Sequence, residues 1–346
     1  MTSPRADSAL TSLRTLGDLL AVVPYLLGFH PADSLVLIAL RDRQIVFQVR
    51  VDLPEPAEAP DLARHLAGLA ERNCATSAVL LGYGTGTRVT PVALALPPAL
   101  ESRGVVLIDA LRVTDGRYWS YLCTEPTCCP PEGTPYDAAS PIAAEAVVNG
   151  YVALPSREEF ARRLEPVSGP AREAMVEATR RADERLAALI ESHTDDPSGA
   201  LLQAGVAALN GAVQRQRVGQ PIDDDELAWL GVVLVYLPVR DHAWASVSGD
   251  LSTDELSTHL SLWTEVVRRG EPDLIVAPAT LLAFAAWRAG EGALASIALA
   301  TALDADPEYR MAQLLYQALV AGLSPTNWAS AQDRQSGTGA RSVDAC

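Results

Sequence analysis

Apolar and polar positions divide the chain into a front part with strand-like patterns and a back part with helical patterns. Residues 35–40 form a continuous apolar run between turn-forming residues, which indicates a buried strand. Residues 44–52 alternate between apolar and polar side chains, which predicts a second strand with one buried face. Residues 41–43 form the turn of this predicted hairpin. A short apolar helix over residues 16–27 precedes it.

The rest of the front part alternates between helices and strands. The predicted elements are a helix over residues 61–72, a buried strand over 77–81, a helix that starts at Thr90 and Pro91, and two strands over 105–113 and 118–123. Asp115 and Gly116 separate the last two strands. Asp-Gly is a favoured two-residue hairpin turn, because both of its residues adopt positive φ. This order of elements predicts an α/β fold, a mixed β-sheet with flanking helices.

Helical periodicity replaces the strand signals after Gly133. Residues 171–193 carry one apolar stripe at helical spacing, and Asp223 with Glu226 forms a capping pair at the start of a later helix. Residues 278–307 resemble a tetratricopeptide hairpin, with small alanines at the expected helix crossing and an Asp-Pro stop. We therefore expect an all-α, tetratricopeptide-like helical domain after the α/β domain.

A length of 346 residues fits about two domains. The expected segments are a loose N-terminus over 1–14, a mixed α/β domain over 15–135, an all-α helical array over 136–331 that contains the hairpin at 278–307, and a disordered tail over 332–346.

Composition excludes several classes of function. The formal net charge of -16 repels phosphate backbones and anionic lipids, so we expect neither nucleic acid nor membrane as a partner. All 27 basic residues are arginine, which excludes a lysine Schiff base and a Walker-type phosphate loop. No apolar run reaches the roughly 18 residues of a membrane span. Five unevenly placed cysteines fit a reducing cytoplasm, and we expect no cofactor.

The segment from Leu19 to Leu35 resembles the opening of actinobacterial proteins that contain the domain of unknown function numbered 4192. Further matches lie at residues 50–54, 119–123, 128–130 with Gly133, 239–241 and 287–307. The resemblance covers nearly the whole chain. It implies a bacterial cytoplasmic protein and no assigned activity.

His30, Asp33 and Ser34 lie together immediately before the first predicted strand. They are the residue types of an acid–base pair with a serine nucleophile. The alternatives are a ligand site and a turn in which these side chains bond the backbone. We favour the turn, because the sequence contains no G-x-S-x-G motif.

Gly82, Gly84, Thr85, Gly86 and Thr87 follow a predicted strand and precede a predicted helix. Free N–H groups near a helix N-terminus attract phosphate, so these residues are ligand-binding candidates. A threonine occupies the position at which the dinucleotide motif G-x-G-x-x-G requires its last glycine. We therefore favour a strand-to-helix loop without a ligand.

Cys123, Cys128 and Cys129 form the pattern C-x4-C-C. A structural zinc site takes four nitrogen or sulfur ligands, usually from spaced pairs. Here two cysteines are adjacent, no histidine is near, and Cys74 would have to come from a distant helix end. We therefore expect no metal, and a redox or regulatory thiol pair or a structural loop remains open.

Arg240, Asp241 and Trp244 lie at a predicted helix junction. Arginine binds carboxylate or phosphate through two hydrogen bonds and tryptophan stacks, so these residues are a second ligand-binding candidate. The alternative is an ion pair that ties two helices together over a buried tryptophan.

No complete catalytic constellation is present, so we favour a non-enzymatic scaffold or regulatory module that binds a protein partner through its helical array. The alternative is a small-molecule or nucleotide-phosphate binding protein, or an enzyme. Its site would lie in the α/β domain, near His30, Asp33 and the loop over residues 82–87. The sequence leaves homo-oligomerisation open.

Overall fold

The computed structural model describes residues 15–42 and 44–325. The segments predicted to be loose or disordered, residues 1–14 and 332–346, lie outside the described residues. Within the described part of the chain, no helix has the length and apolar character needed to cross a membrane.

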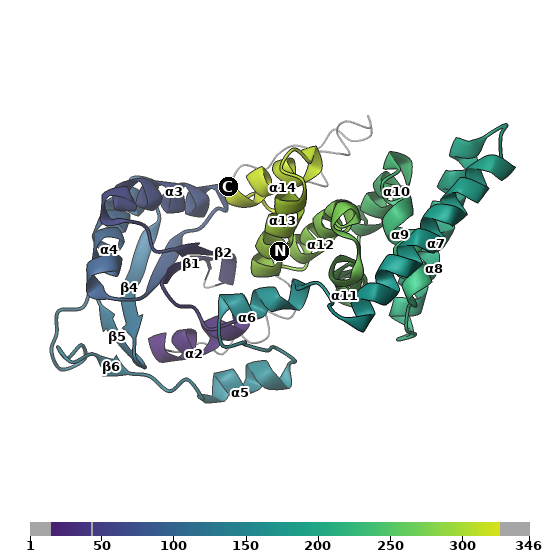
Figure 1. Cartoon of the computed structure of the whole chain (residues 1–346). Coiled ribbons are helices and arrows are strands. Elements are labelled where there is room, and N and C mark those ends of the chain that lie inside the picture. Colours follow the sequence, from purple (N-terminus) through teal and green to yellow (C-terminus); the bar gives the residue numbers. More distant parts are fainter. Residues whose placement is uncertain (1–14, 43, 326–346) are drawn as a thin grey trace. The chain divides into compact units, whose positions relative to one another are not determined.

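The chain forms two compact units (Figure 1). Of the described residues, those up to 160 and those from 321 to 325 form unit 1, and residues 161–320 form unit 2. The predicted layout, a mixed α/β part followed by a helical part, is confirmed. The last strand ends at Pro135, and the helix that follows it belongs to unit 1.

Unit 1 is built on a six-stranded sheet. Its strands are β1 (Ser34–Arg41), β2 (Gln44–Asp52), β3 (Ser77–Tyr83), β4 (Val106–Thr114), β5 (Arg117–Ser120) and β6 (Thr134–Pro135). The order across the sheet is β2-β1-β3-β4-β5-β6. Because β1 is antiparallel to both β2 and β3, and β3 is parallel to β4, the strands β2, β3 and β4 run in one direction. Their carboxyl ends meet beside the start of β1, and we call this end of the sheet the carboxyl edge.

Helices lie on both sides of this sheet (Figure 1). They are α2 (Leu16–Leu27), the short 3-10 helix η1 (Pro56–Glu58), α3 (Ala59–Arg72), α4 (Gly86–Glu101), α5 (Pro141–Val148) and α6 (Arg157–Ala161). The main core forms where α3 and α4 cover one face, with Leu66 and Leu96 packed among Leu35, Leu37 and Leu80 of the sheet. Helices α2 and α5 pack against each other on the other side.

Local sequence signals determine the ends of α2 and the turn between β4 and β5, as predicted. Thr15 caps α2 through a reciprocal pair of hydrogen bonds with Asp18, and Gly28 ends the helix in the left-handed conformation. Asp115 and Gly116 have φ of 52° and 71°, the two positive values that the hairpin turn between β4 and β5 requires. The predicted helix over 16–27 and the predicted hairpin are therefore confirmed.

Helix α4 starts earlier than the sequence indicates. We expected its start at Thr90 and Pro91, whereas it begins at Gly86 and contains Pro91 in its interior. An interior proline costs about 3 kcal/mol, because it removes one backbone hydrogen bond and clashes with the preceding turn. Val89 and Val92 are fully buried against the sheet, and each buried side chain contributes about 1.5–3 kcal/mol. Burial of Val89 therefore offsets much of the cost of the proline.

Unit 2 consists of helices. They are η2 (Arg162–Leu164), α7 (Pro170–Ser192), α8 (Pro197–Arg217), α9 (Asp224–Val233), α10 (Leu237–Ser248), α11 (Thr253–Arg269), η3 (Pro272–Leu274), α12 (Val276–Arg288), α13 (Gly292–Ala305) and α14 (Arg310–Val320). Helix α7 packs on α8 and α9, and α12 packs on α11 and α13. The expected hairpin over 278–307 is the pair α12 and α13, joined at Gly290, whose φ of 79° requires glycine.

Candidate functional site

The carboxyl edge brings two of the predicted segments together. Ser34 stands opposite Tyr83 in the antiparallel pair β1 and β3. The Oδ1 atom of Asp33 lies 3.8 Å from the place that a Cβ atom would take at Gly84. The turn before β1 and the loop after β3 are therefore neighbours, although 50 residues separate Ser34 and Gly84 in the sequence.

The three residues of the hydrolytic hypothesis do not assemble into a triad. His30 is exposed, and its backbone N–H donates to the carbonyl of Leu154 at 2.9 Å. Among the described residues, no hydrogen bond joins His30 to Asp33 or Ser34. The Ser34 hydroxyl is fully buried and has no partner within the described part of the chain. This arrangement provides no base for the serine.

The loop formed by the glycine-rich segment is shorter than the sequence indicates. Gly82 lies in β3, Gly86 and Thr87 begin α4, and Gly84 with Thr85 forms the connection. Gly84 has a φ of 152°, which favours glycine. The Thr85 hydroxyl contacts the Thr87 hydroxyl at 3.0 Å and does not cap the helix.

Arg112 is a positive group beside this helix start. Its Nη1 atom lies 3.4 Å from the place of a Cβ at Gly86, and its guanidinium stacks on Trp119 at 3.8 Å from the ring centre. Within residues 15–42 and 44–325, no carboxylate pairs with Arg112. The first turn of α4 also contains no acidic residue. Arg112 and the first amides of α4 therefore form a positive corner on the carboxyl edge.

The three cysteines after β5 form a cluster of thiols. The Sγ atoms of Cys123 and Cys128 are 3.1 Å apart, and those of Cys128 and Cys129 are 3.9 Å apart. All three Sγ atoms lie within 4.8 Å of one another. Cys128 is exposed, whereas the other two are half-buried. The sequence pattern placed these residues near each other, but it did not indicate that the sulfurs converge.

The thiols influence one another's acidity. Hydrogen bonds from Cys129 and Cys128 lower the pKa of Cys123. The hydrogen bond between Cys123 and Cys128 raises the pKa of Cys128. The hydrogen bond between Cys123 and Cys129 raises the pKa of Cys129 to about 12. Cys123 is therefore the first of the three to become a thiolate.

The Arg240 segment lies on α10 of unit 2. Arg240 donates to Asp241 at 2.7 Å and to the hydroxyl of Tyr309 at 3.4 Å. Trp244 is 6% exposed and stacks on Phe284, with 4.0 Å between the ring centres. The structure thus places Arg240 in an intramolecular pair and Trp244 in the core of unit 2.

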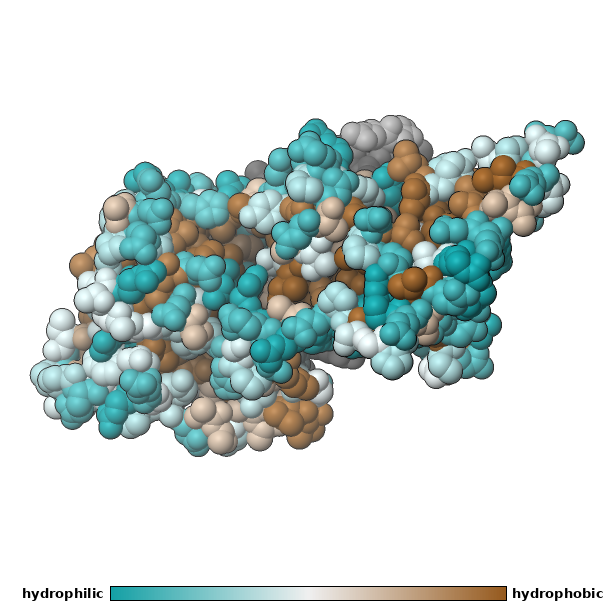
Figure 2. Space-filling model, viewed as in Figure 1, coloured by the Kyte–Doolittle hydropathy of each residue, from teal (hydrophilic) through white to brown (hydrophobic). Residues whose placement is uncertain are grey.

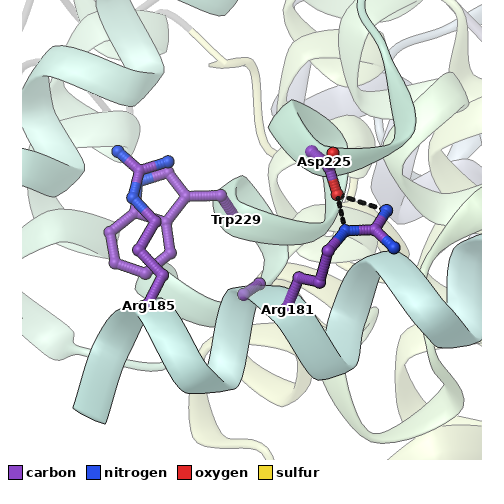
Figure 3. Close-up of a pocket in the computed structure, with 5 residues that line it drawn as sticks. Arg181, Arg185, Asp225 and Trp229 are labelled. Carbon is purple, nitrogen blue, oxygen red and sulfur yellow. Dashed lines mark hydrogen bonds and ion pairs between the residues drawn. The ribbon is translucent and has the colours of Figure 1, made fainter. Parts of the chain in front are cut away.

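A further pocket lies between α7 and α9 of unit 2, and Figure 3 shows it in close-up. It has a volume of about 150 Å³ and is lined by Arg181, Ala182, Arg185, Asp225 and Trp229. Arg181 pairs with Asp225 at 2.6 Å. The guanidinium of Arg185 lies over the indole of Trp229, 4.2 Å from the ring centre.

Arg185 differs from the other arginines that face the start of α9. The acidic first turn of α9 is held by three ion pairs with arginines from three other helices: Arg269 with Asp224, Arg181 with Asp225, and Arg215 with Glu226. Among the described residues, no carboxylate pairs with Arg185. Trp229 is 2% exposed, and its indole N–H has no hydrogen-bond partner in the described part of the chain. The pocket therefore offers an exposed cation beside an indole whose buried N–H has no partner among the described residues.

An exposed apolar patch lies at the end of α5 in unit 1. Val147, Val148 and Val152 are 54%, 86% and 67% exposed, and Figure 2 shows hydrophobic side chains gathered there. Such patches mark contact surfaces when they reach several hundred Å². Three valines are too few to form such a surface alone, so the patch does not define a site.

Sequence reasoning missed the pocket between α7 and α9. Its two key residues, Arg185 and Trp229, are 44 positions apart and lie on different helices. The only local signal is that Arg181 and Arg185 are spaced by four residues, which places them on one face of a helix. This spacing is common on exposed helices and does not by itself indicate a site.

A family model described as a domain of unknown function, DUF4192, matches residues 17–326. No curated protein and no solved structure matches the chain.

Proposed function

We propose that this chain, which belongs to the DUF4192 family, is a protein-binding module whose unit 2 recognises a carboxylate group of a protein partner. The observation that carries the proposal is the pocket formed by Arg185 and Trp229, whose guanidinium has no carboxylate partner and whose indole N–H has no acceptor among the described residues. A carboxylate complements both groups, because it accepts two hydrogen bonds from a guanidinium and a further one from an indole.

The size of the pocket favours one group of a larger partner over a whole small molecule. Pockets that bury drug-sized ligands measure about 300–1,000 Å³. The pocket between α7 and α9 measures about 150 Å³. It accommodates a carboxylate-bearing side chain or a chain terminus, and the rest of the partner would lie on the surrounding helices. Tryptophan and arginine are also the residues that most often dominate protein–protein binding energy.

The charges around the pocket favour a single carboxylate over a polyanion. Arg180 pairs with both Glu177 and Glu184 on the exposed side of α7. An extended acidic segment or a nucleic acid would approach these carboxylates and be repelled. A partner with one carboxylate in a neutral or basic segment avoids that repulsion and still reaches Arg185.

The test compares two charge-removing variants on the same helix. Full-length tagged chains with Arg185→Gln or Arg180→Gln are purified from the native host beside the unmodified chain. We expect a stoichiometric partner with the unmodified chain and with Arg180→Gln. Loss of a charge-assisted hydrogen bond in Arg185→Gln should weaken binding by about tenfold or more.

A second arm tests the chemistry of the contact. Trp229→Phe keeps an aromatic ring and removes the indole N–H together with the five-membered ring, so it should weaken binding of the same partner. Peptides from that partner, with each Asp or Glu changed to its amide or with the chain terminus amidated, distinguish a side-chain carboxylate from a terminal one. Recovery of no partner, or a partner that binds Arg185→Gln and Trp229→Phe unchanged, would refute the proposal.

The positive corner at the carboxyl edge supports a second candidate function, the binding of a small anion in unit 1. The observation in its favour is Arg112, which lies beside the first turn of α4 and has no carboxylate partner among the described residues. The buried hydroxyls of Ser34 and Tyr83 do not add to this site, because strand alternation directs them away from the face that α4 covers. Thermal stabilisation by inorganic phosphate that disappears in Arg112→Gln would support this function, and stabilisation of neither protein would exclude it.

A further inference from the structure

We propose that Cys123, Cys128 and Cys129 bind one thiophilic d10 metal ion, Zn²⁺ or Cu⁺, in unit 1. This site is separate from the pocket in unit 2 and does not depend on the partner-binding function. Three observations carry it: the convergence of the three sulfurs, the hydrogen bonds that fix the loop around them, and the access of solvent to one side of the cluster.

The spacing of the sulfurs suits one metal ion. Zinc–thiolate bonds are about 2.3 Å long, so two thiolates on one tetrahedral zinc lie about 3.8 Å apart. The Sγ atoms of Cys128 and Cys129 are 3.9 Å apart, and no pair in the cluster is separated by more than 4.8 Å. Cys123 and Cys128 are closer, at 3.1 Å. Shifts of less than an ångström therefore bring all three sulfurs to bonding distance from a common centre.

The adjacent cysteines point to one place because the backbone turns sharply before them. The carbonyl of Glu125 accepts hydrogen bonds from the N–H groups of both Cys128, at 3.2 Å, and Cys129, at 2.8 Å. The hydroxyl of Thr134 donates to the carbonyl of Cys128 at 3.2 Å, which ties the turn to β6. This turn resolves the objection from the sequence that neighbouring cysteines are not a spaced pair.

Cys123 is positioned from the other side of the loop. The Ser120 hydroxyl accepts the N–H of Cys123 at 2.9 Å and donates to the carboxylate of Asp109 at 2.6 Å. Asp109 lies in β4, so the sheet supports this side of the cluster. Trp119 completes the closure of the loop by donating its indole N–H to the carbonyl of Pro131 at 2.9 Å. Outer hydrogen bonds of this kind orient metal ligands.

The ligand set determines which metal fits. Thiolates are soft ligands and select Cu⁺ and Zn²⁺ over Mg²⁺ or Ca²⁺. Each thiol that binds releases its proton to solvent. Cys128 is exposed, so a water molecule can take the fourth position on zinc. Cu⁺ would instead be held by the three sulfurs alone.

The test uses the full-length chain with reduced thiols under anaerobic conditions. Zn²⁺ is titrated against a competing chromophoric chelator, Co²⁺ is used as a spectroscopic probe of thiolate ligation, and Cu⁺ is titrated in a parallel arm. We expect one equivalent of metal per chain and thiolate-to-cobalt charge-transfer bands. Zinc binding without copper binding assigns the site to Zn²⁺, and the reverse assigns it to Cu⁺.

Cysteine variants supply the controls. Cys123→Ser, Cys128→Ser and Cys129→Ser should each lower the affinity by about tenfold or more, since even outer-shell changes cost 10–100-fold. The double variant Cys74→Ser/Cys346→Ser removes the two cysteines outside the cluster and should bind one equivalent, as the unmodified chain does. Circular dichroism confirms that each variant is folded.

Two results would overturn the proposal. One is binding of less than a stoichiometric amount of both metals by the reduced, unmodified chain. The other is metal binding that persists in the folded triple serine variant.

Discussion

Two glycines of α8 provide a test of how closely the helices of unit 2 pack. Gly205 is buried where α8 crosses α10, and a Cβ there would lie 2.8 Å from one γ carbon of Val239 and closer still to the other. Gly211 lies on the same helix and is exposed, with nothing within 4 Å of its Cβ position. The same substitution, glycine to alanine, therefore causes a steric clash at Gly205 and none at Gly211.

The magnitude follows from two terms. Alanine is more favourable than glycine inside a helix by about 0.8–1 kcal/mol, and this gain applies to both variants. Gly205→Ala additionally forces a methyl group against Val239, which is fully buried and has a stiff branched side chain. Overpacking of this kind costs about 1–3 kcal/mol. Because both variants gain the same helix propensity, the difference between their free energies of unfolding measures the overpacking.

Urea unfolding followed by tryptophan fluorescence measures this difference. Four of the six tryptophans, at positions 229, 244, 263 and 287, lie in unit 2, so the signal reports mainly on that unit. We expect Gly211→Ala to be more stable than the unmodified chain and Gly205→Ala to be less stable than Gly211→Ala by about 1–3 kcal/mol. Equal stability of the two variants would show that α8 and α10 do not approach each other closely at this point.

Two further predictions concern buried polar groups. Burial lowers the pKa of His259 below 6.5, with Arg288 adding to the shift and Glu255 opposing it. Below about pH 6.5 the unfolded chain therefore binds a proton that the folded imidazole does not, so the free energy of unfolding falls as the pH falls. The variant His259→Gln should remove this part of the pH dependence, which urea titrations at several pH values measure. Ser120→Ala leaves the buried carboxylate of Asp109 without one donor and two loop amides without their acceptor, so it should lower stability by about 1–3 kcal/mol in urea unfolding. A Ser120→Thr variant that keeps the hydroxyl should retain most of that stability.

The fold could be predicted from the sequence wherever a local signal and burial agreed. Thr15 and Gly28 mark the two ends of α2, because helix capping and the left-handed conformation depend on only a few neighbouring residues. The Asp115–Gly116 turn is equally local. The start of α4 was misjudged because Pro91 is a local signal, whereas the burial of Val89 against the sheet is a property of the whole unit.

The candidate sites were less predictable, since each depends on contacts between distant or sharply turned segments. The three cysteines were identified, but their spacing did not indicate that the turn at Glu125 places Cys128 and Cys129 toward Cys123. Arg240 and Trp244 are the residue types of a binding site, yet the fold uses one in an ion pair and the other in the core. Residue type alone does not separate these outcomes.

The contrast between Arg185 and its neighbours supports our proposal that a recognition site lies in unit 2. Arg181, Arg215 and Arg269 each hold one acid of the first turn of α9, so their positions follow from the stability of the helix packing. Arg185 holds no acid among the described residues, and it covers an indole whose buried N–H is unsatisfied. A buried donor without an acceptor costs about 1–3 kcal/mol. Among the described residues, Arg185 is the arginine of this group that holds no acid of α9, and we therefore propose it as the group that receives a carboxylate from outside the chain.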